Sequence, residues 1–110
     1  MRTSFVVLFS TLSALQAVTA YEVTAWSGVV CSGIELGHLE DTNNTPGTSA
    51  TEVTPNGRCI TIDTDLPQDC DVYLCQDEQC DDQGEAVEGP RDAGTRVENQ
   101  SFVAMQVGCQ

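Results

Sequence analysis

The residues of this chain that could do chemistry are one histidine, two nearby serines and many carboxylates. His38 lies beside Glu40 and Asp41, and Ser27 or Ser32 could act as a nucleophile if the fold carried it to the imidazole. Neither serine sits in a sequence that would build a nucleophile elbow. We therefore predict no catalytic residue and no enzymatic activity, with His38 on the surface of a short strand.

Carboxylates are concentrated between residues 63 and 82, where hard oxygen ligands would favour calcium. No Asp-x-Asp-x-Asp-Gly loop is present, and a solvated acidic edge that discourages strand-to-strand aggregation accounts for the charge without an ion. We predict no metal site and no cofactor. The acidic residues of this segment are Asp63, Asp65, Asp69, Asp71, Asp77, Glu78, Asp81 and Asp82.

Six cysteines are the second chemical feature, and all of them follow residue 20. An even number of cysteines in a short exported chain indicates three disulfides. Zinc is the alternative, but an oxidising compartment converts thiols to disulfides and so disfavours it. Each bridge adds about 2 to 4 kcal/mol to a domain too small for a large core. The predicted half-cystines are Cys31, Cys59, Cys70, Cys75, Cys80 and Cys109.

The N-terminal residues 1–20 have the order of a signal peptide, with Arg2, then an apolar stretch, then small residues up to Ala20. We predict cleavage after Ala20, with Val18 and Ala20 in the two side-chain pockets of the protease. A retained membrane anchor is the alternative, but polar residues such as Gln16 interrupt the apolar stretch, and a span needs about 20 apolar residues. The chain is predicted to be secreted and extracellular, with no membrane anchor.

Residues 21–110 are predicted to form a single domain of strongly acidic character. The whole chain has 17 acidic and four basic residues and a formal net charge of −13. Binding to phosphates requires Lys and Arg to replace counterions, so this balance excludes nucleic acid and anionic membranes as partners. The partner is predicted to be an unknown extracellular protein or glycan.

The fold of these residues is predicted to be all-β. Short runs rich in Val, Ile, Thr and aromatic residues alternate with Gly, Pro, Asn and Asp, without helical periodicity. The main loops are expected at Asp41–Pro55 and Gly89–Gly94. The expected strands are Tyr21–Ser27, Ile34–Leu39, Cys59–Asp63, Asp71–Gln76, Glu85–Val87 and Phe102–Val107.

An internal similarity relates two segments at a constant offset of 49 residues, Val23–Cys31 and Val72–Cys80. Each segment reads as a strand, a turn and a cysteine. A structural duplication and a chance similarity both stay open, because the only identical residues are Val and Cys and a repeat of two units is a weak signal. If the repeat is real, Cys31–Cys59 and Cys80–Cys109 are its symmetric pairings, leaving Cys70 with Cys75. Five residues of extended strand would separate those two Cα atoms by about 16 Å, beyond disulfide reach. All fifteen connectivities therefore stay open.

The apolar residues of the expected strands supply the predicted core, and Trp26 is either part of it or an exposed contact for a partner. Two glycosylation sequons occur, at Asn43 in the longest predicted loop and at Asn99 just before a strand. The predicted core residues are Val23, Ala25, Ile34, Leu36, Ile60, Ile62, Val72, Leu74, Phe102, Ala104 and, depending on register, Met105 or Val103.

The run Cys70–Cys80 and the C-terminal run Ser101–Cys109, together with the leader, resemble the small cysteine-rich secreted proteins of filamentous fungi. Some effector-like members of that group have a βγ-crystallin-like fold, and the repeat resembles their two Greek-key motifs. The resemblance implies a disulfide-rich sandwich of two such motifs. Trp26 matches the usual aromatic of the crystallin hairpin, whereas Cys75 replaces it in the second copy. The segment Asn43–Ser49 is one residue too long for the crystallin-type calcium loop.

This resemblance implies an effector-like protein that acts outside the cell by binding a component of a host or competitor. The alternative is a secreted toxin that harms target cells directly. The acidic charge argues against the common cationic mode of toxin action, which depends on attraction to anionic membranes.

Overall fold

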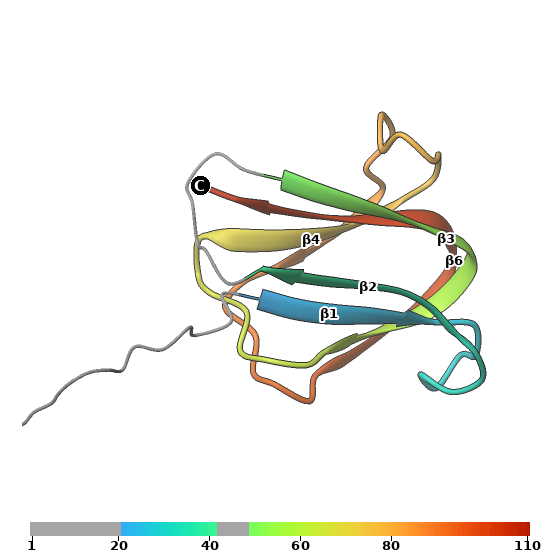
Figure 1. The fold of residues 1–110 in the computed structure, drawn as a ribbon, viewed down its shortest axis with the longest axis horizontal. Coiled ribbons are helices and arrows are strands. Elements are labelled where there is room, and N and C mark those ends of the chain that lie inside the picture. The colour runs from blue at the N-terminus through green and yellow to red at the C-terminus, as the bar shows by residue number, and fades with distance from the viewer. Residues whose placement is uncertain (1–20, 42–48) are drawn as a thin grey trace, which may run out of the picture.

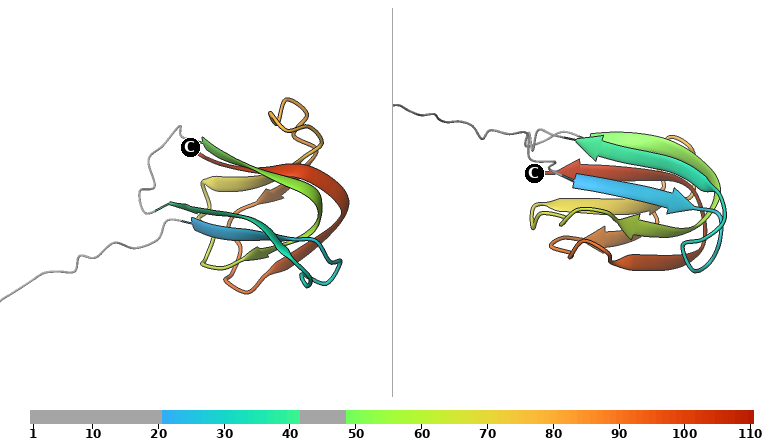
Figure 2. Two further views of the ribbon diagram at one scale, coloured as in Figure 1. Left: turned by 45° about the vertical axis from the view of Figure 1, so that its right-hand side comes forward. Right: turned by 60° about the horizontal axis from the view of Figure 1, so that its bottom comes forward.

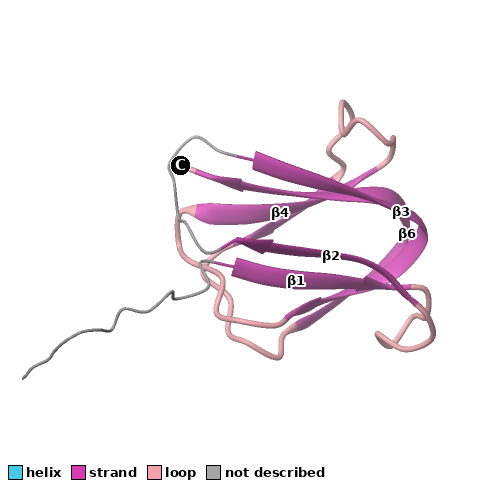
Figure 3. Cartoon of the chain, in the orientation of Figure 1, coloured by secondary structure: helices cyan, strands magenta, loops and turns pink. Residues whose placement is uncertain are grey.

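The structure is a computed structural model that describes residues 21–41 and 49–110. The predicted signal peptide and the predicted sequon at Asn43 lie outside these residues. The described residues form strands and loops without a helix, as Figure 3 shows, and no helix among them could cross a membrane. The strands are β1 (Tyr21–Trp26), β2 (Glu35–Asp41), β3 (Ser49–Ile62), β4 (Cys70–Cys75), β5 (Glu85–Glu88) and β6 (Arg96–Cys109).

The strands pair in one antiparallel sheet, in the order β2-β1-β3-β6-β4-β5. The all-β prediction is therefore confirmed. Strands β3 and β6 are long, and both curve strongly at one end of the molecule, on the right in Figure 1. This curvature folds the sheet on itself, and the further views of Figure 2 show the same bend.

The two bent strands are longer than the sequence suggested, and two predicted boundaries are wrong. The loop predicted for Asp41–Pro55 is strand from Ser49 onwards, and β6 begins at Arg96, not at Phe102. The breaker run Pro55-Asn56-Gly57 makes a bend within β3, because the β3–β6 register shifts on both sides of Gly57. A local irregularity of this kind bends a strand without ending it.

The strand order is palindromic, with β1, β2 and β3 in the first half and β4, β5 and β6 in the second. Each half is a hairpin whose first strand also pairs with the long strand of the same half. Positions of β1 and β4 correspond at an offset of 49 residues (Val23 to Val72), and those of β3 and β6 at an offset of 45 (Ile62 to Val107). The register pairs that define this correspondence are Val23–Ile62 with Val72–Val107, and Trp26–Cys59 with Cys75–Ala104.

The axis that relates the halves passes between Gly57 and Phe102. These two residues correspond to one another under the offset of 45, and they also pair with one another in the sheet. Only one of the two carries a side chain, and the Phe102 ring fills the space beside Gly57. The pairing of the strands is therefore close to two-fold symmetric, whereas the residues at its centre differ.

The core lies between the two halves of the folded sheet and draws residues from both. Most of the predicted core is confirmed, and Met105 is fully buried whereas Val103 is only partly buried. Ile34 is a correction, because it is 70% exposed in the turn before β2, and Leu36 is partly buried against the core. The largest fully buried side chains are Phe102, Ile60, Ile62, Leu66, Leu74 and Met105.

All six cysteines form disulfides, as predicted, and none is free. Of the symmetric pairings, Cys31–Cys59 is confirmed, whereas Cys80–Cys109 and Cys70–Cys75 are wrong. Because β4 runs from Cys70 to Cys75 as one extended strand, its two ends cannot be bridged. The observed pairs are Cys70–Cys109 and Cys75–Cys80.

Candidate functional site

The outer face of β1 and β2 carries a connected group of polar side chains. Successive side chains of a strand alternate between the two faces of the sheet, so Glu22 and Thr24 point away from the face that carries buried Val23. The register sets Thr24 opposite His38 on β2. It also sets Glu22 opposite Glu40. Because β2 is the last strand at this end of the sheet, the group lies along an edge.

Hydrogen bonds hold one side of the His38 imidazole. The hydroxyl of Thr24, which is buried, donates to Asp63 Oδ2 at 2.6 Å and lies 2.9 Å from His38 Nδ1. On the far side of this carboxylate, the hydroxyl of Thr61 donates to Asp63 Oδ1 at 3.0 Å. Thr61 also accepts a bond from Trp26 Nε1 at 3.1 Å. A continuous chain of contacts therefore links Trp26 to the imidazole.

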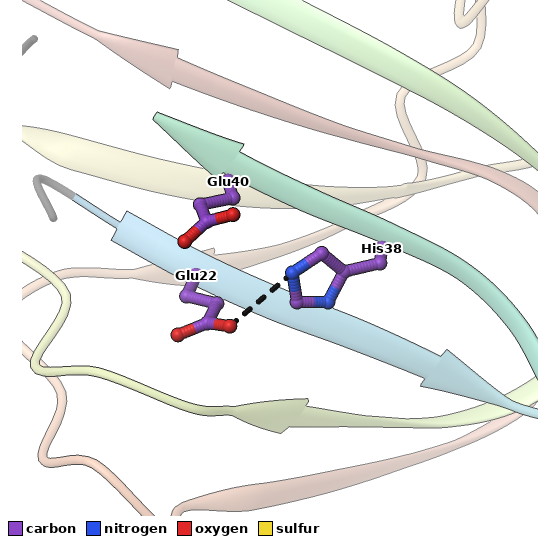
Figure 4. A group of neighbouring side chains, drawn as sticks. All are labelled: Glu22, His38 and Glu40. Carbon is purple, nitrogen blue, oxygen red and sulfur yellow. Dashed lines mark ion pairs between the residues drawn. The ribbon is translucent and has the colours of Figure 1, made fainter. Parts of the chain in front are cut away.

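The other ring nitrogen of His38 faces two carboxylates, as Figure 4 shows. Nε2 lies 3.2 Å from Glu22 Oε2, and the side chains of His38 and Glu22 are 35% and 29% exposed. One ligand atom from each of Glu22, His38 and Glu40 lies within 4.8 Å of the other two. These three side chains form the triad, the name used for them below.

His38 does not meet the serines that the sequence offered as nucleophiles. The Ser27 hydroxyl accepts a bond from the backbone N–H of Ile34 at 2.9 Å, which closes the turn between β1 and β2. Ser32 lies in the same turn. The imidazole contacts side chains of β1 instead, so its surroundings are those of a surface polar network.

The acidic residues between positions 63 and 82 are dispersed. The Asp77 carboxylate accepts bonds from the backbone N–H groups of Asp82 at 2.7 Å and Asp81 at 3.1 Å. The bond from Asp82 is the main reason why the pKa of Asp77 is lowered from its ordinary value of 3.8. In the part of the chain that the structure describes, no three carboxylates of this segment converge as the triad does.

The turn between β1 and β2 exposes aliphatic side chains. Val29 is 47% exposed, Val30 54% and Ile34 70%. The turn is held in shape by the Cys31–Cys59 disulfide and by a bond from Cys31 N–H to the Gly28 carbonyl at 3.1 Å. The partner contact predicted at Trp26 is only partly exposed, because this residue lies on the outer face of β1 with its indole N–H bonded to Thr61.

The predicted sequon at Asn99 lies on β6 and is partly buried. Its Nδ2 donates to Glu85 Oε1, and its Oδ1 accepts a bond from the Ser101 N–H at 2.9 Å. A glycan on Nδ2 would replace the contact with Glu85. Glycosylation at Asn99 stays a prediction, as it does at Asn43.

The sequence reasoning placed His38 on the surface but missed its partners Glu22, Thr24 and Asp63. Alternation alone could have placed Glu22 and Thr24 on one face of their strand. The pairing of β1 with β2 and β3 was needed to bring that face beside His38 and Asp63.

Comparisons with protein families, characterised proteins and solved structures give no match for this chain.

Proposed function

We propose that this protein is a secreted, effector-like binding module that contacts an extracellular protein of a host or competitor through the turn between β1 and β2. Three disulfides in a small all-β domain are consistent with export. The observation that carries the proposal is the exposure of Val29, Val30 and Ile34 on a turn held by a disulfide.

The second half of the chain supplies an internal comparison for this turn. Cys31 and Cys80 both have a positive φ, 54° and 58°. The backbone N–H of each donates a hydrogen bond to the backbone carbonyl of the residue three positions earlier, at 3.1 Å. At the positions of Val29 and Val30 the second turn carries Glu78 and Gln79. The turn geometry therefore does not require aliphatic residues, and their exposure in the first turn needs another explanation.

An aliphatic turn tip on an acidic molecule favours a protein partner over a glycan. Burial of aliphatic side chains against another apolar surface stabilises a complex by roughly 25 cal/mol per Å² of apolar surface removed from water. The rigid turn also loses little conformational entropy on binding. The first part of β3, Ser49–Val53, pairs with the end of β6 that also pairs with β4. This pairing between the two halves supports the βγ-crystallin-like resemblance as part of this proposal.

The test is capture of a partner by the oxidised protein and by a turn variant. The variant Val29→Glu with Val30→Gln gives the first turn the residues of the second, so we expect it to fold and to lose capture from host or competitor extracellular fluid. Glu78→Gln, in the second turn, is the matched control and should capture as the parent does. Disulfide mapping and circular dichroism establish that each variant is folded.

A partner captured equally well by the parent and the turn variant would remove the turn from the proposal. Failure to recover any reproducible partner would remove the binding function itself. Growth arrest or leakage of target cells dosed with the parent protein would favour the toxin instead, and loss of that effect in the turn variant would assign it to the same residues.

A further inference from the structure

The triad places two carboxylates of the same sign side by side. Glu22 and Glu40 are directly opposite one another on β1 and β2, and both lie on the outer face of the sheet. Like charges in directly opposite positions destabilise an antiparallel pair. A cation between the two side chains would remove this cost.

The hydrogen bonds of Thr24 determine which ring nitrogen of the neutral His38 imidazole carries the proton. A threonine hydroxyl has one proton, and that of Thr24 is directed to Asp63 Oδ2 at 2.6 Å. The contact between Thr24 Oγ1 and His38 Nδ1 at 2.9 Å therefore requires the proton on Nδ1. In the neutral ring, the Nε2 lone pair then faces the Glu22 carboxylate at 3.2 Å. Acceptors converge on one point from the imidazole and from the carboxylates.

We propose that Glu22, His38 and Glu40 bind a divalent transition-metal ion of the Zn²⁺ type, through His38 Nε2 and one oxygen of each carboxylate. Imidazole nitrogen with carboxylate oxygen is a ligand set that suits Zn²⁺, whereas calcium prefers oxygen alone. The ligand atoms lie within 4.8 Å of each other. Rotation of the Glu side chains would bring them to the roughly 3.3 Å separations of tetrahedral zinc.

Thr24 and Asp63 have the role of outer-shell groups in this site. Metal-binding histidines usually donate their second ring N–H to an oxygen that fixes the tautomer and the orientation of the ring. Here Thr24 Oγ1 is that oxygen, and Asp63 fixes the hydroxyl in turn. Thr24 is therefore a positioning residue, because it acts on the metal only through His38.

The second half of the chain repeats the carboxylate pair without the imidazole. Asp71 and Glu88 are opposite one another on β4 and β5, as Glu22 and Glu40 are on β1 and β2. In the equivalent of the Thr24–His38 pair, the second half has Tyr73 opposite Ala86. It thus offers a matched pair of carboxylates that should not bind Zn²⁺ in the same way.

The composition makes the site easy to examine. His38 is the only histidine of the chain, so every imidazole signal in a nitrogen NMR spectrum belongs to it. All six cysteines are in disulfides, which removes thiolates as competing ligands. The site does not depend on the partner-binding turn, so either proposal can fail without the other.

The experiment is a titration of the oxidised protein with ZnCl₂, followed by calorimetry and by the ring nitrogen resonances of His38. We expect one ion per chain, with Nε2 shifted and Nδ1 keeping its proton. His38→Ala, Glu22→Gln and Glu40→Gln should each weaken binding by about tenfold or more, whereas Asp71→Asn and Glu88→Gln should change it less than about twofold.

Thr24 is tested by its conservative replacement. Thr24→Val should weaken Zn²⁺ binding by about tenfold because the ring loses the acceptor for Nδ1–H, and Thr24→Ser should restore the affinity. A Thr24→Ser protein that is folded but binds as weakly as Thr24→Val would show that packing, not the hydroxyl, is responsible.

Three outcomes would overturn the site. Zn²⁺ binding that is unchanged in His38→Ala would show that acidic groups elsewhere on the surface hold the ion. Equal shifts of the His38 resonances with CaCl₂ would show that the imidazole senses charge alone. A ring that keeps protons on both nitrogens in excess ZnCl₂ at neutral pH would show that an imidazolium–Glu22 ion pair occupies the place of the metal.

Discussion

Gly57 illustrates at the scale of one residue how closely the centre of the molecule is packed. A Cβ at this position would lie 2.3 Å from Phe102 Cε2 and 2.5 Å from Cζ, far inside van der Waals contact. Phe102 is fully buried, so its ring could move away only by displacing neighbouring side chains of a closely packed core. Glycine is required at position 57 by this approach, not by its backbone angles.

We predict that Gly57→Ala lowers the free energy of unfolding by about 1 to 3 kcal/mol, the usual cost of an overpacked core. Gly108→Ala is the control, because its Cβ would meet only Tyr73 Cε2 at 3.9 Å, and it should change stability by less than about 0.5 kcal/mol. Denaturant unfolding measures both. If Gly57→Ala with Phe102→Leu is no more stable than the sum of the single changes predicts, the clash is not the cause.

Tyr21 gives a second prediction at this scale, in its response to alkali. Burial raises the pKa of Tyr21 above its ordinary value of 10.0, and the charge of Asp41 raises it further. A raised pKa in the folded state means that the contribution of Tyr21 to stability is present below about pH 10 and is lost as pH rises through the folded-state pKa.

The measurement for Tyr21 is denaturant unfolding from about pH 8 to about pH 11. The parent should lose stability over this range, and Tyr21→Phe should lose less because it has no phenol to ionise. Tyr73→Phe is the matched control and should follow the parent. Identical pH profiles for the parent and Tyr21→Phe would contradict the assignment.

At the scale of the elements, sequence patterns located all six strands but not the lengths of two of them. Runs of β-formers marked β1, β2, β4 and β5 to within about two residues, because these strands end at Gly, Asp or Pro turns. In β3 the same breaker residues produce a bend, since the strand is held on both sides by neighbours. A local sequence pattern does not show which distant strands will pair with a segment, so the full length of β3 could not be predicted from it.

The disulfide pattern shows the same limit. The turn cysteine of the first half, Cys31, is bridged to β3, whereas its counterpart Cys80 is bridged to the end of β4. The repeat therefore conserves the turn cysteine but not its partner. Cys70 is then bridged to Cys109, which stands directly opposite it in the β4–β6 register.

We predict that the three disulfides contribute to stability in the order of the loops they close. The closed loops span 39 residues for Cys70–Cys109, 28 for Cys31–Cys59 and 5 for Cys75–Cys80. The loss of chain entropy in the unfolded state then predicts that these bridges add about 4, 3.5 and 2 kcal/mol, in that order, to the free energy of unfolding. Unfolding of the three Cys→Ala pair variants under identical oxidising conditions gives the order. A Cys75–Cys80 variant less stable than the other two would contradict this account.

At the scale of the whole molecule, charge works against the fold. The chain carries 17 acidic residues against four basic ones. Repulsion among like charges destabilises a compact state, and salt screens it over about 10 Å at 0.1 M. The excess of acidic residues, and the repulsion that follows from it, can be inferred from the composition without any coordinates.

We predict that raising NaCl from about 0.01 M to about 0.3 M increases the Tm by several degrees. This shift corresponds to an increase on the order of 1 kcal/mol in the free energy of unfolding. Removing charge with Glu78→Gln and Asp81→Asn, both exposed in the second turn, should reduce that salt response. Scanning calorimetry at matched pH gives both values. A Tm that falls with added salt would show that attractive pairs outweigh the repulsion.

The pairing of Gly57 with Phe102 also means that this fold cannot be built from two identical copies of either half of the present chain. Two copies of the first half would place two glycines on the axis and leave its centre without a side chain. Two copies of the second half would place two rings where there is space for one. With glycine and phenylalanine as the two residue types, the centre is filled only when the halves differ. A forerunner made of identical halves would therefore have needed a different residue at this position.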